Sequence, residues 1–329
     1  MSSSLNKEGE DLLFTKLKLL FITKDWSSGI ERNNYYLSQS LNNLTTLTIW
    51  EESGDIQDIL TTLHFKPDFI LLNDLRPTRC PEITGLKECK IPVGMIMHDL
   101  HYKTSYRKQF IEENNIRYLF THYRDKFLEW FPEYEDRMIW FPHFVHIDVF
   151  KDYQEEKTID FLLMGSTYPP IYPLRAAILD ELGNLPNFTY HEHPGYDKET
   201  YDEENFFVGS RYAREINKAK IFFTCDSIYQ YPVMKYFEVL ASRTLLLASH
   251  SQELEDLGFI PGIHYVEIDL DTYYEKALYY LQNYEGIGKE IAENGYQMVR
   301  KYHSVDVRAK FLVKTINSLI KDLKKESEF

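Results

Sequence analysis

Lys235 and Glu238 stand three residues apart in a segment, 233–242, whose apolar spacing predicts a helix. The apolar side chains of that segment lie four and three residues apart on one face: Val233, Phe237 and Leu240. The lysine and the glutamate occupy another face, near the helix start, which points back to the ends of strands. There a lysine can neutralise a diphosphate, and the paired oxygens of a carboxylate suit two vicinal ribose hydroxyls. Spacing alone favours the simpler alternative, an i,i+3 pair on a solvated face.

Gly165-Ser166 directly follows a predicted buried strand, 159–164. A glycine at that point lets the backbone approach a ligand, and a following helix can offer free N–H groups to a phosphate. The segment is neither a GxGxxG nor a GK[ST] motif, so it supports no dinucleotide site and no P-loop. A plain turn after a strand explains it equally well.

His98-Asp99 also follows a predicted strand, 92–98, and opens a loop. A histidine at a strand end facing a cleft can act as a general base for an acceptor hydroxyl, or contact a donor sugar or phosphate. The alternative is a capping aspartate beside a structural histidine. A metal site is not expected, because the nearby histidines fall into two separate segments with no H-x-x-x-H on one helix: His98, His101, His143 and His146.

Gly29 follows the loop after the first predicted strand and is expected to start a helix that runs to about residue 41. The run Ser27-Ser28-Gly29 has residue types that suit a helix N-cap. A helix cap and a ligand-binding turn are both consistent with this glycine.

The elements that must position these residues alternate between short apolar runs and helical patterns, which is typical of parallel α/β structure. A polar segment without a pattern, 149–158, separates two such series and is interpreted as a linker. In open α/β sheets, ligands bind at the carboxyl ends of the strands. The sequence therefore predicts two Rossmann-like domains that face each other across a cleft. The expected strands are 18–23, 45–50, 68–73, 92–98, 117–121 and 138–141, then 159–164, 188–191, 221–224, 244–248 and 265–268.

Composition narrows the class of protein. The chain has 329 residues, with 37 basic and 51 acidic side chains and a net charge of −14. This charge argues against a broad nucleic-acid-binding surface. Three scattered cysteines give no disulfide framework, the N-terminus is polar and unlike a signal peptide, and no apolar run is long enough to span a membrane. A cytoplasmic protein fits these features best.

Residues 236–248 (YFEVLASRTLLLA) resemble the F-E-x-L-A-x-G-x-L-L-L pattern of group 1 glycosyltransferases with the GT-B fold, and most of all the CgeB-like, spore-maturation type branch. Further pieces resemble the family's motifs in order. The resemblance covers about 140–305, whereas 1–130 is similar only in architecture. The additional pieces are 140–150, 159–166 with Arg175, Glu253-Leu254, Pro261-Gly262 and 291–303.

This resemblance implies a GT-B enzyme that moves a sugar from a nucleotide-diphosphate sugar, UDP- or GDP-linked, to a hydroxyl acceptor without a metal or other cofactor. Residues 1–150 would hold the acceptor, 151–310 the donor, and a helix at 311–329 would cross back to the first domain. Glu238 would bind the ribose. Arg175, Lys235 and the Gly165-Ser166 turn would stabilise the leaving diphosphate. His98 or Asp99 would act on the acceptor side, and Gly29 would help its loop approach donor or acceptor.

Departures from the family pattern leave points open. Gln230 stands where many retaining members carry a first glutamate, eight residues before Glu238, so a retaining outcome is not assumed. Ser242-Arg243 replaces a glycine. The Lys-Gly that follows the first strand of the second domain in relatives is absent, and Arg175 would supply that charge.

Two alternatives remain at this point: an inactive GT-B scaffold or sugar-binding subunit, and a nucleotide-sugar epimerase. The sequence does not name the sugar, the acceptor or the oligomeric state. The net negative charge weakens docking on an anionic membrane, while peripheral membrane contact stays open.

Overall fold

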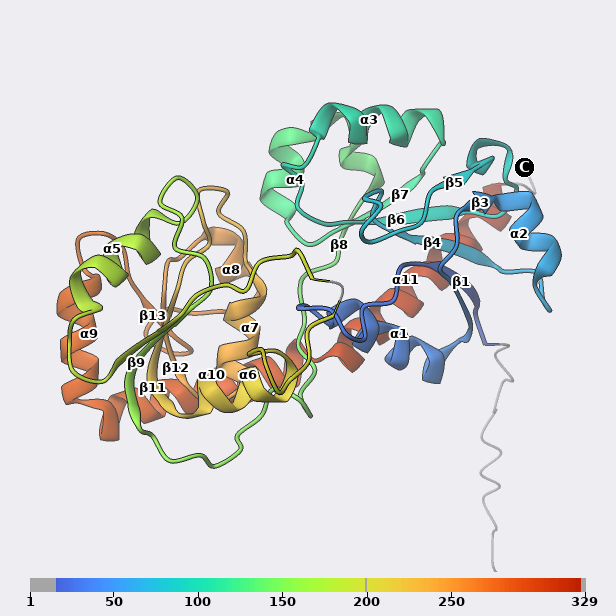
Figure 1. Cartoon of the computed structure of the whole chain (residues 1–329). Coiled ribbons are helices and arrows are strands. Elements are labelled where there is room, and N and C mark those ends of the chain that lie inside the picture. The colour runs from blue at the N-terminus through green and yellow to red at the C-terminus, as the bar shows by residue number, and fades with distance from the viewer. Residues whose placement is uncertain (1–15, 199, 327–329) are drawn as a thin grey trace, which may run out of the picture.

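The computed structural model describes residues 16–198 and 200–326, which form two α/β lobes (Figure 1). The first lobe is built on a six-stranded parallel sheet in the order β2-β1-β4-β6-β7-β8. The polar N-terminal segment, expected not to be a signal peptide, lies outside the described residues. The strands of this sheet are β1 (Lys18–Ile22), β2 (Thr46–Trp50), β4 (Phe69–Asn73), β6 (Val93–Met97), β7 (Tyr118–Thr121) and β8 (Met138–Trp140).

The second lobe contains a five-stranded parallel sheet in the order β10-β9-β11-β12-β13. In each sheet the second strand lies on one side of the first strand and the later strands lie on its other side. The strand order therefore switches at β1/β4 and at β9/β11. This switch opens a crevice at the carboxyl ends of those strands. The strands are β9 (Ile159–Met164), β10 (Phe188–His191), β11 (Ala219–Thr224), β12 (Leu245–Ala248) and β13 (Val266–Glu267).

Helices cover both faces of each sheet, which explains why the central strands are apolar along their whole length. Every residue of β4 and β6 is buried, as expected for parallel strands with two covered faces. The helices are α1 (Asn33–Leu44), α2 (Ile56–Thr62), α3 (Thr104–Glu113), α4 (Arg124–Trp130), α5 (Pro173–Leu182), α6 (Gly209–Asn217), α7 (Met234–Ala241), α8 (Gln252–Asp256), α9 (Tyr273–Gln282), α10 (Lys289–Tyr302) and α11 (Val305–Glu326).

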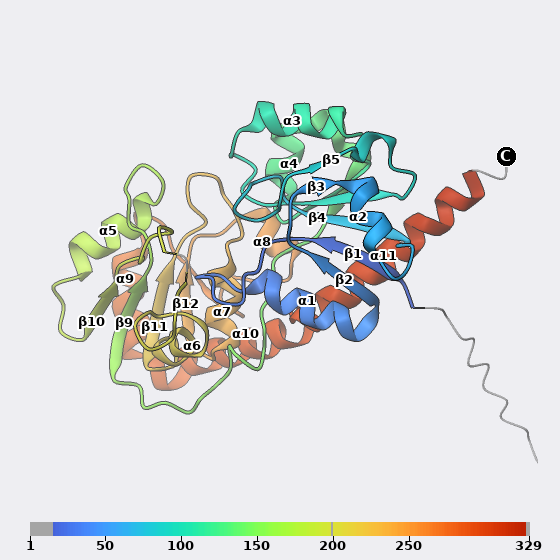
Figure 2. The ribbon, with the colours of Figure 1, turned by 45° about the vertical axis from the view of Figure 1, so that its right-hand side comes forward.

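The last helix returns to the first lobe. Figures 1 and 2 both show α11 running beside α1 at the first sheet, far from the second sheet that precedes it in the chain. Leu312 and Ile316 of α11 are fully buried in the same core cluster as Leu37 and Leu41 of α1. The two lobes are therefore joined twice, by the segment after β8 and by α11.

Local structure differs from the sequence expectation at Gly29. This glycine does not start a helix, because α1 begins four residues later with Arg32 as its N-cap residue. The carboxylate of Asp25 accepts a hydrogen bond from the Ser27 N–H at 2.8 Å, and Gly29 N–H donates to the Trp26 carbonyl. Residues 25–29 thus form a turn rather than a cap.

Three smaller features were not predicted. A two-residue pair of strands, β3 (Gly54–Asp55) and β5 (Ile83–Thr84), lies outside the main sheet. A single π-helical turn, η3 (Tyr284–Gly288), precedes α10. The helical C-terminal region also breaks at His303-Ser304, because Val145 exchanges backbone hydrogen bonds with His303 and Val305 there.

Candidate functional site

A cavity of about 820 Å³ lies between the two lobes and receives residues from both. Most residues singled out from the sequence line it: His98 and Asp99 on the first lobe, and Ser166, Arg175, Lys235 and Glu238 on the second. A smaller adjoining cavity of about 160 Å³ shares Lys235 and Glu238 and is bordered by Gly165. The strand-end positions thus converge on one place, as the parallel sheets require.

The first turn of α7 brings Lys235 and Glu238 to the wall of the cavity. The solvated-face interpretation of this pair is wrong, since only 6% of Glu238 is exposed. Gly165 makes room for the lysine. Its φ of +110° strongly favours glycine, and a Cβ there would lie 3.3 Å from Lys235 Cε.

Burial disfavours the charged forms of both Lys235 and Glu238. Burial and the neighbouring Arg175 lower the pKa of Lys235 to about 8. Burial also raises the pKa of Glu238 to about 7, against the opposing effect of Lys235. Within residues 16–198 and 200–326, the Lys235 ammonium makes no hydrogen bond or ion pair, and it lies 5.9 Å from the centre of the Tyr212 ring. Glu238 acts on it as a nearby counter-charge but does not offset its desolvation, so the site favours binding of an anion.

Arg175 lies across the β9/β11 switch point. Its Nη2 donates to Thr224 Oγ1 at 2.9 Å and to the Cys225 carbonyl at 3.0 Å, and its guanidinium lies 4.1 Å from the centre of the Tyr172 ring. These partners are neutral, so they orient the guanidinium without cancelling its charge. Arg175 Nε is buried and has no partner among the described residues. Together with Lys235, this side chain makes the donor-side wall electropositive in an acidic protein.

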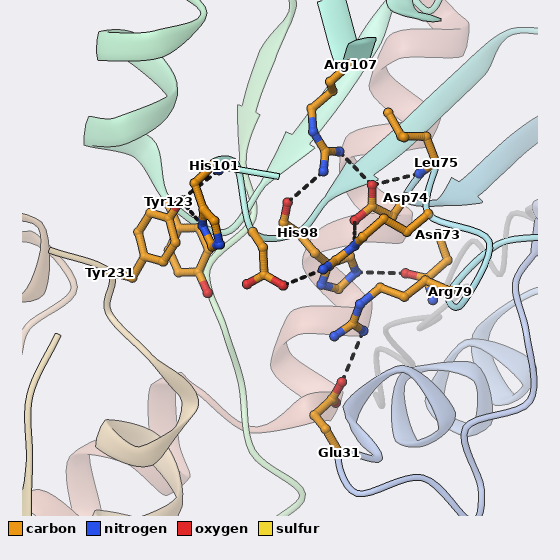
Figure 3. A network of polar contacts seen from close by, with 12 residues as sticks. Glu31, Asn73, Asp74, Leu75, Arg79, His98, His101, Arg107, Tyr123 and Tyr231 are labelled. Atoms are coloured by element: carbon orange, nitrogen blue, oxygen red, sulfur yellow. Dashed lines mark hydrogen bonds and ion pairs between the residues drawn. The ribbon is translucent and has the colours of Figure 1, made fainter. Parts of the chain in front are cut away.

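His98 and Asp99 lie on the opposite wall, at the carboxyl end of β6, within a network of polar contacts (Figure 3). His98 Nε2 is 2.8 Å from Asn73 Oδ1. Burial, with a smaller contribution from Arg79, lowers the pKa of His98 well below its usual value. The ring is therefore neutral at physiological pH.

Asp99 is held by Arg76, whose Nη1 lies 2.7 Å from its carboxylate. Burial raises the pKa of Asp99, but the charge and hydrogen bond of Arg76 together with the charge of Arg79 outweigh it and leave that pKa below the usual value. The carboxylate is thus ionised and already engaged. Of the two acceptor-side candidates, His98 is the one whose side chain is not held in an ion pair.

Sequence reasoning missed several residues that line the cavity beside His98. His122 and His143 follow β7 and β8, and their rings stack with centroids 4.1 Å apart. His122 directly follows the predicted strand 117–121, and His143 comes two residues after the predicted strand 138–141, so position at a strand end was the available signal. Glu31 had no such signal. Its carboxylate accepts from Asn33 N–H, pairs with Arg79 at 3.2 Å, and raises the pKa of Glu238 from the opposite lobe.

Two residues singled out from the sequence do not line either cavity. Gly29 lies in the turn described above, packed against Trp26. Gln230 is exposed in the loop between β11 and α7, with a positive φ of 54°. In that loop Tyr231, not Gln230, is buried, and its ring stacks on Tyr123 of the first lobe with centroids 3.7 Å apart.

Comparison with known proteins identifies the second lobe. The model of a family described as glycosyl transferase-like matches residues 151–314, the half that contains Gly165, Arg175, Lys235 and Glu238. Residues 151–314 are therefore similar to glycosyl transferase-like domains. No curated protein matches this sequence.

Solved structures match across nearly the whole chain. A glycosyltransferase from Rickettsia africae ESF-5 is 13% identical with a TM-score of 0.61, covering 94% of this chain and all of the other. HepE from Anabaena in complex with UDP and glucose is 10% identical with a TM-score of 0.65, covering 92% of this chain and all of its own. Sucrose-phosphate synthase from Thermosynechococcus elongatus is 11% identical with a TM-score of 0.63, covering 93% and 100%. At these identities the likeness shows the fold.

The predicted fold class is confirmed: the chain has the GT-B fold, with two Rossmann-like domains facing across a cleft. The family match over residues 151–314 supports the predicted glycosyl transfer. Among the helices that the structure describes, none is long and apolar enough to cross a membrane.

Proposed function

We propose that the cleft binds a nucleotide-diphosphate sugar on its C-terminal wall and transfers the sugar to a hydroxyl acceptor on its N-terminal wall. Residues 1–150 would form the acceptor domain and 151–310 the donor domain, and the helix within 311–329 would tie the chain back to the first. The observation that carries the proposal is the Lys235 ammonium on the cavity wall, with no direct hydrogen bond or ion pair to a described residue, beside an Arg175 held only by neutral groups.

The diphosphate would lie against Lys235, Arg175 and the backbone of the Gly165-Ser166 turn. When the bond to the sugar breaks, negative charge builds on the leaving phosphate, and cations already oriented toward it lower the barrier. The ribose hydroxyls would donate to Glu238. His98 would accept a hydrogen bond or a proton from a sugar hydroxyl on the opposite wall. Closure of the two walls would exclude water.

The nucleotide, the branch of the family, the absence of a metal and the location are each supported by a separate observation. A UDP-linked sugar is favoured because HepE, a protein of the same fold, was solved with UDP and glucose. The motif at 236–248 supports placement in the CgeB-like branch. The cations of the donor wall support a metal-independent reaction, since they occupy the role that a metal ion has in other transferases. The free cysteines support a cytoplasmic location.

Calorimetric titration with UDP-glucose, GDP-mannose and the free diphosphates tests the donor site. Lys235→Ala removes a charge that no described residue pairs with, so the protein should fold normally and lose at least about tenfold in affinity for its preferred donor, the effect of one charge-assisted hydrogen bond. Lys218→Ala is the matched control, because that lysine pairs with Glu215 on the outside of the same domain. Equal affinity in both variants, or no binding of any donor by the wild type, would contradict the proposal.

A further inference from the structure

Thr23, Asn73 and His98 form a hydrogen-bonded line across three adjacent strand ends. Thr23 follows β1, Asn73 is the last residue of β4, and His98 follows β6. These three strands are neighbours in the first sheet. Asn73 Nδ2 donates to Thr23 Oγ1 at 2.8 Å, and Asn73 Oδ1 lies 2.8 Å from His98 Nε2, a contact drawn in Figure 3. Asn73 is completely buried, so its amide exchanges no hydrogen bond with bulk water.

The direction of these hydrogen bonds determines which ring nitrogen carries the proton. Thr23 has one hydroxyl proton, and it donates that proton to the Lys24 carbonyl at 3.0 Å. Its oxygen must therefore accept from the Asn73 amide group, which leaves Asn73 Oδ1 facing His98. A carbonyl oxygen only accepts, so His98 Nε2 must carry the hydrogen. In a neutral ring, Nδ1 then holds the free lone pair.

Surrounding charges keep the ring neutral and its lone pair available. The groups that face it are Arg79, Arg76, His122 and His143, all of which disfavour a second proton. His98 Nδ1 has no hydrogen-bond partner among the described residues, and it is not one of the fully enclosed unpaired atoms, so it is open to the cavity that His98 lines. Arg107 fixes the backbone by donating to the His98 carbonyl at 3.2 Å.

We propose that Asn73 is a positioning residue which, oriented by Thr23, fixes His98 as the Nε2–H tautomer with a bare Nδ1 open to the cleft. The tautomer stands on the contacts above. The use of Nδ1 to accept a hydrogen bond or proton from a sugar hydroxyl rests on the proposed function.

Long-range 1H–15N NMR of protein labelled with 15N-histidine reads the tautomer directly, with His98→Gln used to assign the signal. The wild type should show a neutral Nε2–H ring that does not titrate between about pH 5 and 8. In Asn73→Asp, a carboxylate faces Nε2–H and stabilises the imidazolium, so His98 should titrate within that range. A wild-type Nδ1–H tautomer, or a signal that Asn73→Asp leaves unchanged, would overturn the inference.

Thr23→Val gives a second test that keeps the shape of the side chain. It removes the acceptor that orients the Asn73 amide, so the NMR signal should report a mixture of both tautomers. An unmixed Nε2–H ring would overturn the role of Thr23. In the pH profile of UDP-glucose turnover, Asn73→Asp should move the acidic limb to higher pH, which a purely structural role would not do. The NMR results are separable from the proposed function. The protein can fail to bind a donor and still show the Nε2–H tautomer, and it can bind a donor and show the other tautomer.

Discussion

The proposed donor wall contains two residues whose charges depend on pH near neutrality, Lys235 and Glu238. Lys235 loses its proton above a pKa of about 8, and Glu238 gains one below about 7. The lysine was visible in the sequence as part of an i,i+3 pair, but its burial was not. Burial lowers its pKa, and Arg175, which comes from another element, lowers it further through charge repulsion.

The affinity for UDP-glucose should therefore peak between about pH 7 and 8. Above the pKa of Lys235 the cation is lost, and affinity should fall by up to about tenfold per pH unit. Below the pKa of Glu238 the ribose loses its ionised acceptor, and affinity should fall again. Calorimetry across pH checks this. Lys235→Ala should lack the alkaline limb and Glu238→Gln the acidic limb, whereas a flat wild-type profile would contradict the assignment.

Gly165 should tolerate no side chain. Gly165→Ala places a Cβ at a φ of +110° and 3.3 Å from Lys235 Cε, so it should cost about 1–3 kcal/mol of unfolding free energy and weaken donor binding. Gly286→Ala is the control, because a Cβ there meets nothing within 4 Å. Urea unfolding measures both. Similar stability in the two variants would mean that the backbone at Gly165 is not restrained as described.

At the scale of elements, the parallel strands could be predicted and the loops could not. The run 68–73 anticipates β4, because an apolar strand buried on both faces leaves a clear signal. Gly29 and Gln230 were misplaced for the same physical reason. The path of a loop depends on contacts that a hydrophobic pattern does not predict. Examples are the hydrogen bond from the Ser27 N–H to Asp25 and the stacking of Tyr231 on Tyr123.

The loop between β11 and α7 ties the second domain to the first. Tyr231 is buried within the core cluster of the first domain, and the Tyr229 ring stacks on His101 with centroids 4.3 Å apart. Tyr231→Ala should cost about 3 kcal/mol of stability and loosen the domain pair, seen as a larger radius of gyration by small-angle X-ray scattering. Tyr279→Ala, which removes an exposed ring on α9, should change neither. An unchanged radius for Tyr231→Ala would contradict this role.

For the whole molecule, the net charge of −14 coexists with two cations, Arg175 and Lys235, on the wall of the cavity. Recognition of a diphosphate requires only a few local cations, and in the proposed function these two would supply them inside an acidic protein. The sequence could predict both Rossmann-like domains, and four of the residues it singled out in the second domain line the cavity: Ser166, Arg175, Lys235 and Glu238. Glu31 left no signal in the sequence. His122 and His143 follow predicted strands, but their meeting in one cavity depends on strand order and on how the two domains face each other.

A crystal structure of the protein with bound UDP-glucose tests the central claim most directly. The account predicts the diphosphate within hydrogen-bond distance of Lys235 Nζ and the Gly165-Ser166 backbone, with the ribose hydroxyls on Glu238 and the sugar facing His98. A nucleotide bound elsewhere, or a cleft that leaves Lys235 without a phosphate contact at saturating UDP-glucose, would contradict it.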